Sequence, residues 1–230
     1  TLYTSAVLEL SQTPVRVTLP ASGDRYLTVA LMDMFTDQAA MIGADEHGGK
    51  GGVFTIVGPD TPPVDDANVI RLPSNDVWLL VRTFVAGTGD LEAARAVQSG
   101  VIVEPVDANA VARRFKIKAP AEMESKTFLG LTNELLGRSP SHPQLARAAP
   151  FSSKGVVPGQ IQVWSNLPAG VRAAWSAWLP RSLAMIRKGL SSNENGLGWN
   201  APPGILGDYG ANDVVRSAIA LTGFGALKTE

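Results

Sequence analysis

The sequence predicts an α+β fold, an antiparallel β-sandwich or barrel of jelly-roll-like form followed by a helical C-terminal part. Short apolar or alternating segments separated by turn residues fill the first half of the chain, as in antiparallel sandwiches and barrels. Apolar residues recur at helical spacing in the second half. The 23 glycines and 16 prolines among 230 residues indicate many turns. A hydrophobic content of 45% excludes intrinsic disorder.

The first half contains a series of predicted strands. Val15, Val17 and Leu19 alternate with polar residues, which is typical of a half-buried strand. Residues 26–35 are apolar on both faces, which favours a strand covered on two sides, with a helix as the competing interpretation. A glycine-rich connector is expected over residues 41–52. The predicted strands are 1–10, 15–19, 26–35, 53–57, 69–72, 77–85, 101–106 and 111–117.

The predicted helices begin with a short one over residues 90–99, with Asp90 as its N-cap and Gly100 after its end. Further helices are expected over 120–137, 142–150, 171–190 and 212–222. In the helix expected over 171–190, Pro180 predicts a kink or break near residues 178–179. The sequence thus divides into a β-rich part, 1–118, and a helical part, 119–230, which we expect to pack together as one structural domain.

Charge and composition exclude several classes of protein. The formal net charge is −1 and charged residues make up 18% of the chain, which argues against a nucleic-acid binder and a polybasic membrane anchor. No run of 18 apolar residues occurs, so no membrane span is expected. Because the chain contains no cysteine, it has no disulfide, no zinc–thiolate site and no cysteine nucleophile. His47 and His142 lie far apart in the sequence, and neither belongs to a metal-ligand motif, so we expect no metal and no cofactor.

Two charged residues stand within apolar strand segments. Arg82 shares a strand face with Trp78 and Phe84, and Asp33 shares one with Leu31. A charge in such a place must be paired, reach solvent or meet a ligand. The two interpretations are a structural ion pair and an anion-binding site inside a barrel mouth.

The connector 195–210 is the second unusual feature. It holds five glycines, Trp199 and Tyr209, and it joins two predicted helices. A connection of this length between helices usually has a functional purpose. Packing against the sheet is one interpretation, and lining a ligand pocket or an interface is the other; Arg216 in the following helix can face the same place.

The chain resembles a bacterial family, domain of unknown function 1254, through an ordered set of motifs. They are TLYTSAVLEL, PASGDRYLTVALMDMFTD, GGVFTIVGP, RLPSNDVWLLVRTFV, GDLEAARAVQSG, NGLGWN and GDYGANDVVRSAIALTGFGA. The resemblance implies a β-rich sandwich with helices, a periplasmic or secreted location, a tendency to oligomerise and a following jelly-roll-like domain of unknown function 1214. It also implies that the flanks of a longer protein lie on both sides of the chain. The polar or aromatic members of the motifs are Tyr3, Arg82, Trp199, Tyr209 and Arg216.

Two functional hypotheses follow. In the first, the chain is a binding or assembly module that docks the companion domain or another copy of itself. In the second, it is an enzyme or receptor that holds a small anionic molecule near Arg82 and Arg216, with Asp33 and Tyr209 in the same pocket. No residue is assigned a catalytic role, because no nucleophile, acid–base pair or phosphate-loop motif is complete.

Overall fold

The computed structural model describes residues 1–43, 48–118, 124–191 and 212–221. The chain divides into two compact units, each considered by itself. The strand unit comprises Thr1–Lys116 and Leu135–Arg147, and the helical unit comprises Ile117–Glu134 and Ala148–Glu230.

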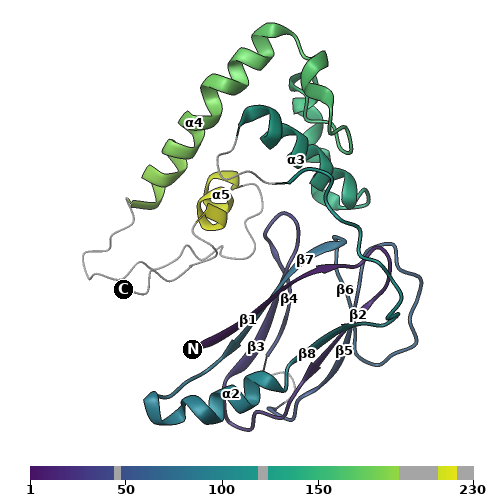
Figure 1. Cartoon of the computed structure of the whole chain (residues 1–230), viewed down its shortest axis with the longest axis vertical. Coiled ribbons are helices and arrows are strands. Elements are labelled where there is room, and N and C mark those ends of the chain that lie inside the picture. Colours follow the sequence, from purple (N-terminus) through teal and green to yellow (C-terminus); the bar gives the residue numbers. More distant parts are fainter. Residues whose placement is uncertain (44–47, 119–123, 192–211, 222–230) are drawn as a thin grey trace. The chain divides into compact units, whose positions relative to one another are not determined.

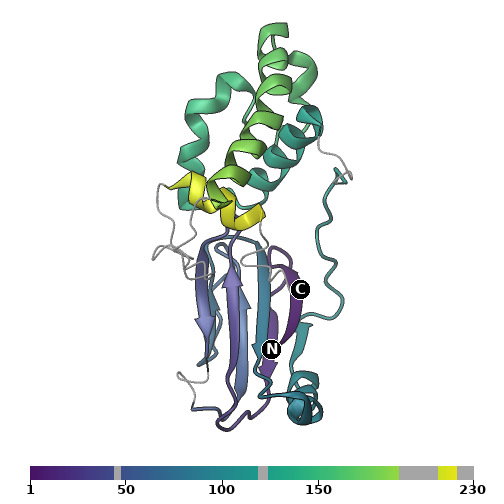
Figure 2. The ribbon, with the colours of Figure 1, turned by 90° about the vertical axis from the view of Figure 1, so that its left-hand side faces the viewer.

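Two four-stranded sheets form the strand unit (Figure 1). The pairings are antiparallel except that between β5 and β6, which is parallel. The first sheet has the order β1 (Leu2–Glu9), β7 (Asp76–Thr83), β3 (Leu27–Met32), β4 (Gln38–Ile42). The second has the order β6 (Val69–Arg71), β5 (Gly52–Val57), β2 (Val15–Leu19), β8 (Ile102–Pro105). Figure 2 shows strands of this unit lying alongside one another.

Both sheets contribute to a single hydrophobic core. On β7 the inward residues Val77, Leu79 and Val81 are completely buried, whereas Arg82 on the other face is exposed. This alternation follows from the two-residue period of a strand, and it is the pattern the sequence shows. The predicted α+β class with strands first and helices after is confirmed, and neither sheet closes into a barrel among the described strands.

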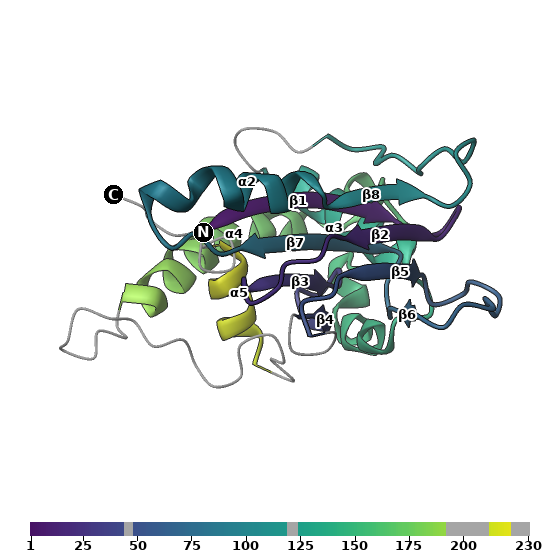
Figure 3. The ribbon, with the colours of Figure 1, turned by 90° about the horizontal axis from the view of Figure 1, so that it is seen from below.

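One helix lies beside β1, as Figure 3 shows. After the short turn η1 (Thr88–Asp90), α2 (Leu91–Ser99) buries Ala94 completely. The Gln98 side chain donates a hydrogen bond to the Tyr3 carbonyl, with an N–O distance of 3.0 Å. Asp90 is the N-cap residue as predicted, but its carboxylate makes no capping bond because Arg25 and the Ala86 N–H occupy it.

Two predicted strands differ from the structure, and one observed strand was not predicted. Residues 111–117 were expected to form a strand, but they are irregular, and the Arg113 N–H donates to Glu9 instead of to a neighbouring strand. β4 was not predicted, because its sequence QAAMI has no alternation and precedes the glycine-rich segment. The strand expected over 26–35 ends at Met32, where Asp33 begins a turn.

The helical unit contains most of α3 (Ser125–Arg138) and all of η3 (Val163–Asn166), α4 (Ala169–Ser191) and α5 (Asp213–Leu221), while η2 (Pro143–Lys154) crosses the unit boundary. The completely buried Asn133 organises the turn after η2. Its amide donates to the carbonyls of Gly155 and Gln160, and its oxygen accepts the Val157 N–H. α4 continues through Pro180 without the break that was one of the two predicted outcomes. In the described residues, every helix is too short or too polar to cross a membrane.

Candidate functional site

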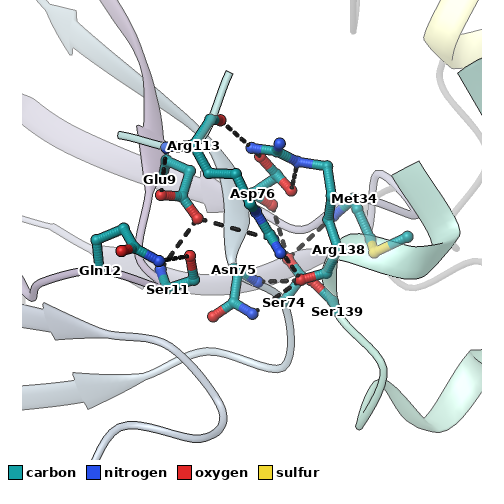
Figure 4. Close-up of polar contacts among 10 residues, drawn as sticks. All are labelled: Glu9, Ser11, Gln12, Met34, Ser74, Asn75, Asp76, Arg113, Arg138 and Ser139. Carbon is teal, nitrogen blue, oxygen red and sulfur yellow. Dashed lines mark hydrogen bonds and ion pairs between the residues drawn. The ribbon is translucent and has the colours of Figure 1, made fainter. Parts of the chain in front are cut away.

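A buried ion pair is the centre of the main polar cluster in the strand unit (Figure 4). The Arg138 guanidinium donates through Nε to Asp76 Oδ2 and through Nη2 to Asp76 Oδ1, both at 2.7 Å. Asp76 starts β7 and Arg138 ends α3. Bidentate geometry of this kind is the strongest form of an arginine–carboxylate contact.

Backbone and hydroxyl groups around this pair join three segments of the chain. The Asn75 N–H donates to Ser139 Oγ at 2.7 Å, and the Asn75 amide donates to the Arg138 carbonyl at 2.9 Å. Arg138 and Arg113 each donate a side-chain hydrogen bond to the other's carbonyl. The Phe115 ring lies 4.2 Å from the guanidinium carbon of Arg138. The cluster therefore holds the irregular segment 106–116 and the end of α3 against β7.

Glu9 extends the cluster to the end of β1. Its carboxylate accepts the backbone N–H groups of Arg113 and Ser11 and lies 3.8 Å from the Arg113 guanidinium. Burial alone would raise the pKa of Glu9, but the hydrogen bonds from Arg113 and Ser11 outweigh it and lower that pKa from its ordinary value. Glu9 is therefore held as an anion.

A polar crevice of about 400 Å³ opens beside the cluster. Arg113, partly exposed, and the exposed Asp60 are the charged groups through which the crevice can meet a solute. The carboxylates of Asp76 and Glu9 are already engaged by arginine side chains or backbone N–H groups, so the arrangement acts first as a structural clamp. The crevice is lined by Leu10, Ser11, Gln12, Thr13, Pro14, Asp60, Thr61, Pro62, Asn75, Arg113, Gly137, Arg138 and Pro140.

Asp33, one of the residues singled out from the sequence, forms a second buried pair with His142. Asp33 Oδ2 and His142 Nε2 are 3.0 Å apart, and His142 Nδ1 accepts the Gln144 N–H. A ring nitrogen that accepts an N–H carries no proton, so Nε2 donates to Asp33. Asp33 Oδ1 accepts the N–H groups of Phe35 and Asp37 and stabilises the turn in which Thr36 adopts a left-handed φ of 68°. These contacts fit the interpretation of Asp33 as a member of a structural pair.

The other residues predicted for a site belong to different parts of the structure. Tyr3 and Arg82 are neighbours on the first sheet, in register with each other, and both are exposed. Arg216 lies in α5, is buried, and has Asp213 at 3.9 Å. Trp199 and Tyr209 lie outside the described residues. Arg82 and Arg216 belong to different units, so a pocket shared by them stays a prediction.

Around Tyr3 and Arg82, the first sheet presents an exposed apolar face, which we call the outer face. Tyr3 and Val7 of β1 are paired with Arg82 and Trp78 of β7, and their side chains therefore point to the same side. Val7 is 75% exposed and Phe84 47% exposed. The outer face consists of Tyr3, Val7, Tyr26, Met41, Trp78, Arg82 and Phe84.

No pattern in the sequence indicated the Asp76–Arg138 pair. Its partners are 62 residues apart, and the motif RLPSNDVWLLVRTFV, in which Asp76 lies, does not include Arg138. Among the described residues, no group of three or more histidines and carboxylates is placed to hold a metal ion.

Comparison with known proteins bears on these observations. Residues 1–105 match the family model "Protein of unknown function (DUF1254)". The DUF1254 match runs from β1 to the end of β8 and confirms the resemblance inferred from the motifs, while the companion domain of unknown function 1214 stays a prediction. No curated protein matches the chain.

A crystal structure of the VPA0106 protein from Vibrio parahaemolyticus is similar to this chain, with a TM-score of 0.73 and 19% identity. The similarity covers 96% of this chain but 56% of that protein, and at this identity it shows the fold alone. The fold that includes the DUF1254 match thus occurs in that protein as part of a longer chain.

Proposed function

We propose that this chain is a binding or assembly module whose outer face packs against a further domain of the same polypeptide. The observation that carries the proposal is the exposed apolar cluster on the outer face, five of whose members are large hydrophobic residues at least 44% exposed. A sheet whose one face forms the core does not need aromatic residues on the other for its own stability. Contiguous exposed apolar groups of this kind mark interaction surfaces.

The composition of the outer face supports docking to protein. Tyrosine, tryptophan, phenylalanine, methionine and arginine are the residues enriched in protein interfaces, and all occur here. Arg82, beside Tyr3, supplies the single formal charge within it. The further domain is favoured over a second copy because the similar VPA0106 chain extends well beyond the shared fold.

We further propose the periplasmic or secreted location and the jelly-roll-like companion that the family resemblance implies. An epitope-tagged product of the complete gene should then appear in the periplasmic or extracellular fraction of the bacterium. Recovery with a cytoplasmic marker enzyme would contradict the location and leave the docking proposal intact.

The alternative, a receptor or enzyme for a small anion at Arg82 and Arg216, rests on no specific observation in either unit. Thermal-shift measurements with small carboxylates and phosphates test it directly, because a ligand of the native state raises the melting temperature. A shift that is lost in both Arg82→Ala and Arg216→Ala would favour it over docking.

The docking proposal is tested by hydroxyl-radical footprinting of the complete gene product and of the 230-residue chain. Tyr26, Met41 and Phe84 should be oxidised at least about twofold more slowly in the complete product, since a docked interface excludes solvent from its centre. Phe115, 42% exposed and outside the outer face, is the internal control.

Two results would overturn the proposal. One is equal oxidation in both proteins, and the other is a gene that encodes nothing beyond these residues. If the outer face of the 230-residue chain becomes more protected from oxidation as its concentration rises, and light scattering shows dimers, the docking partner is a second copy and not a further domain.

A further inference from the structure

The helical unit contains an apolar groove that the proposed docking function does not use. Its volume is about 540 Å³, within the range of small-molecule sites. Side chains from the end of η2 and the first half of α4 surround it. They are Phe151, Lys154, Gly170, Val171, Ala174, Trp175 and Trp178.

Aromatic rings form the walls of this groove. Trp178 is 57% exposed and Phe151 55% exposed, so both present open ring surface. Trp175 is held in place, because its indole N–H donates to the Lys154 carbonyl at 2.8 Å and its ring packs against Phe128. The groove thus has a fixed inner wall and an open aromatic rim.

Trp178 and Met185 share an exposed stripe of α4 that continues from the groove, since they are seven residues apart on one helix. The Arg181 guanidinium lies 5.7 Å from the Trp178 ring centroid, over its face. A cation therefore stands at the rim beside the apolar stripe, and Lys154 supplies another in the lining.

The charge of this part of the chain is entirely positive. Residues 148–193, which belong to the helical unit, contain five of the twenty basic residues and none of the twenty-one acidic ones. An apolar ligand with a negative group would bury its chain against the tryptophans and place its charge near Lys154 and Arg181. A cationic ligand would meet no carboxylate of this segment to pair with its charge.

We propose that the groove binds a small amphipathic anion, an alkyl- or aryl-chain carboxylate. Its concave shape favours a small molecule over a flat partner surface, and the basic surroundings set the sign of the head group. The inference is independent of the outer face, because the two surfaces lie in different units and share no residue.

Dodecanoate, kept below its micellar concentration, is the probe for this site. We expect saturable binding of one molecule per chain in calorimetry, together with a blue shift of tryptophan emission as Trp178 leaves water. Trp178→Ala should weaken binding at least about tenfold, because it removes a large aromatic surface against which the alkyl chain packs. Lys154→Gln should weaken the binding of dodecanoate by about threefold, because an exposed charge contributes modestly to affinity. The same substitution should leave the binding of the uncharged dodecan-1-ol unchanged.

Matched controls are Val111→Ser, an exposed apolar residue of the strand unit, and Arg95→Gln, an exposed cation of α2. Neither should alter binding, and circular dichroism verifies that all variants fold. Absence of saturable binding, or equal losses in the controls, would overturn the proposal. Binding only to phosphatidylglycerol vesicles, with no affinity for dodecanoate, would also overturn it and identify a membrane-contact surface instead.

Discussion

Arg138 and Asp76 show at the scale of single residues how this chain joins distant segments. Both side chains are at least nine-tenths buried, and the guanidinium also holds the Arg113 carbonyl and the Phe115 ring. A buried charge in such a place is tolerated only because its partner is present. The pair therefore fixes where α3 ends on the first sheet.

Replacing Arg138 should destabilise the protein severely. Arg138→Ala leaves the Asp76 carboxylate buried and uncompensated, and we expect the free energy of unfolding to fall by about 3–5 kcal/mol in urea denaturation. Arg16→Ala is the matched control, since Arg16 pairs with Glu104 at 3.7 Å on the exposed surface. Its cost should stay below about 1 kcal/mol. Equal effects of the two variants would contradict the structural role of the buried pair.

Asp90 illustrates a different use of an ion pair. Arg25 donates to both of its carboxylate oxygens at 2.6 Å, and the Ala86 N–H adds a third hydrogen bond. The hydrogen bond from Arg25 is the main reason that the pKa of Asp90 lies far below its ordinary value. The residue predicted as a helix cap thus ties the start of α2 to the segment before β3.

The lowered pKa of Asp90 gives a pH dependence with a definite sign. A carboxyl group whose pKa is lowered by folding stabilises the native state above its unfolded pKa of about 3.9, and the stabilisation is lost as the pH falls below that value. The midpoint of urea unfolding should therefore decrease more steeply between pH 5 and pH 3, roughly the range of this titration, in the native sequence than in Asp90→Asn. Parallel pH profiles for the two proteins would show that the pair contributes nothing.

α4 shows at the scale of an element how a helix accommodates a residue that does not favour it. Pro180 lies inside the helix, and without an N–H it leaves the Ser176 carbonyl without its usual partner. Pro180 and Ser176 are both exposed, so water can replace the missing bond. Ser182 donates through Oγ to the Trp178 carbonyl at 2.9 Å, which adds a bond within the same turns.

Removing the proline should stabilise the helix. Pro180→Ala restores the backbone bond, and even after the greater freedom of the unfolded chain is subtracted we expect a gain of about 1–2 kcal/mol. Thermal and urea unfolding of the variant measure it. Ala177→Ser, at an exposed position on the same helix, is the control and should change stability by less than about 0.5 kcal/mol. A loss of stability in Pro180→Ala would show that the proline fits a bend that the protein requires.

At the scale of the whole molecule, the near-zero net charge conceals a separation of charge along the chain. Seven basic residues and no acidic ones occur between positions 135 and 193, and the rest of the chain is acidic. The overall composition alone argued against basic binding surfaces. The separation matters for binding, because a solute responds to the local charge and not to the sum.

The sequence by itself determined the α+β class with strands first and helices after, and the family resemblance. These depend on local information, namely the alternation in β2, the turn residues and the helical spacing of α4. β4 escaped prediction because its strand form comes from pairing with β3 and not from its own pattern.

Only the tertiary structure decided which polar groups meet. Asp33 contacts His142, and Asp76 contacts Arg138. The Asp33–His142 and Asp76–Arg138 contacts join residues more than sixty positions apart, so they depend on strand register and on the paths of the connecting segments. A single sequence carries no periodic signal of such contacts, because the cost of an unpaired buried charge acts only once the chain has folded around it.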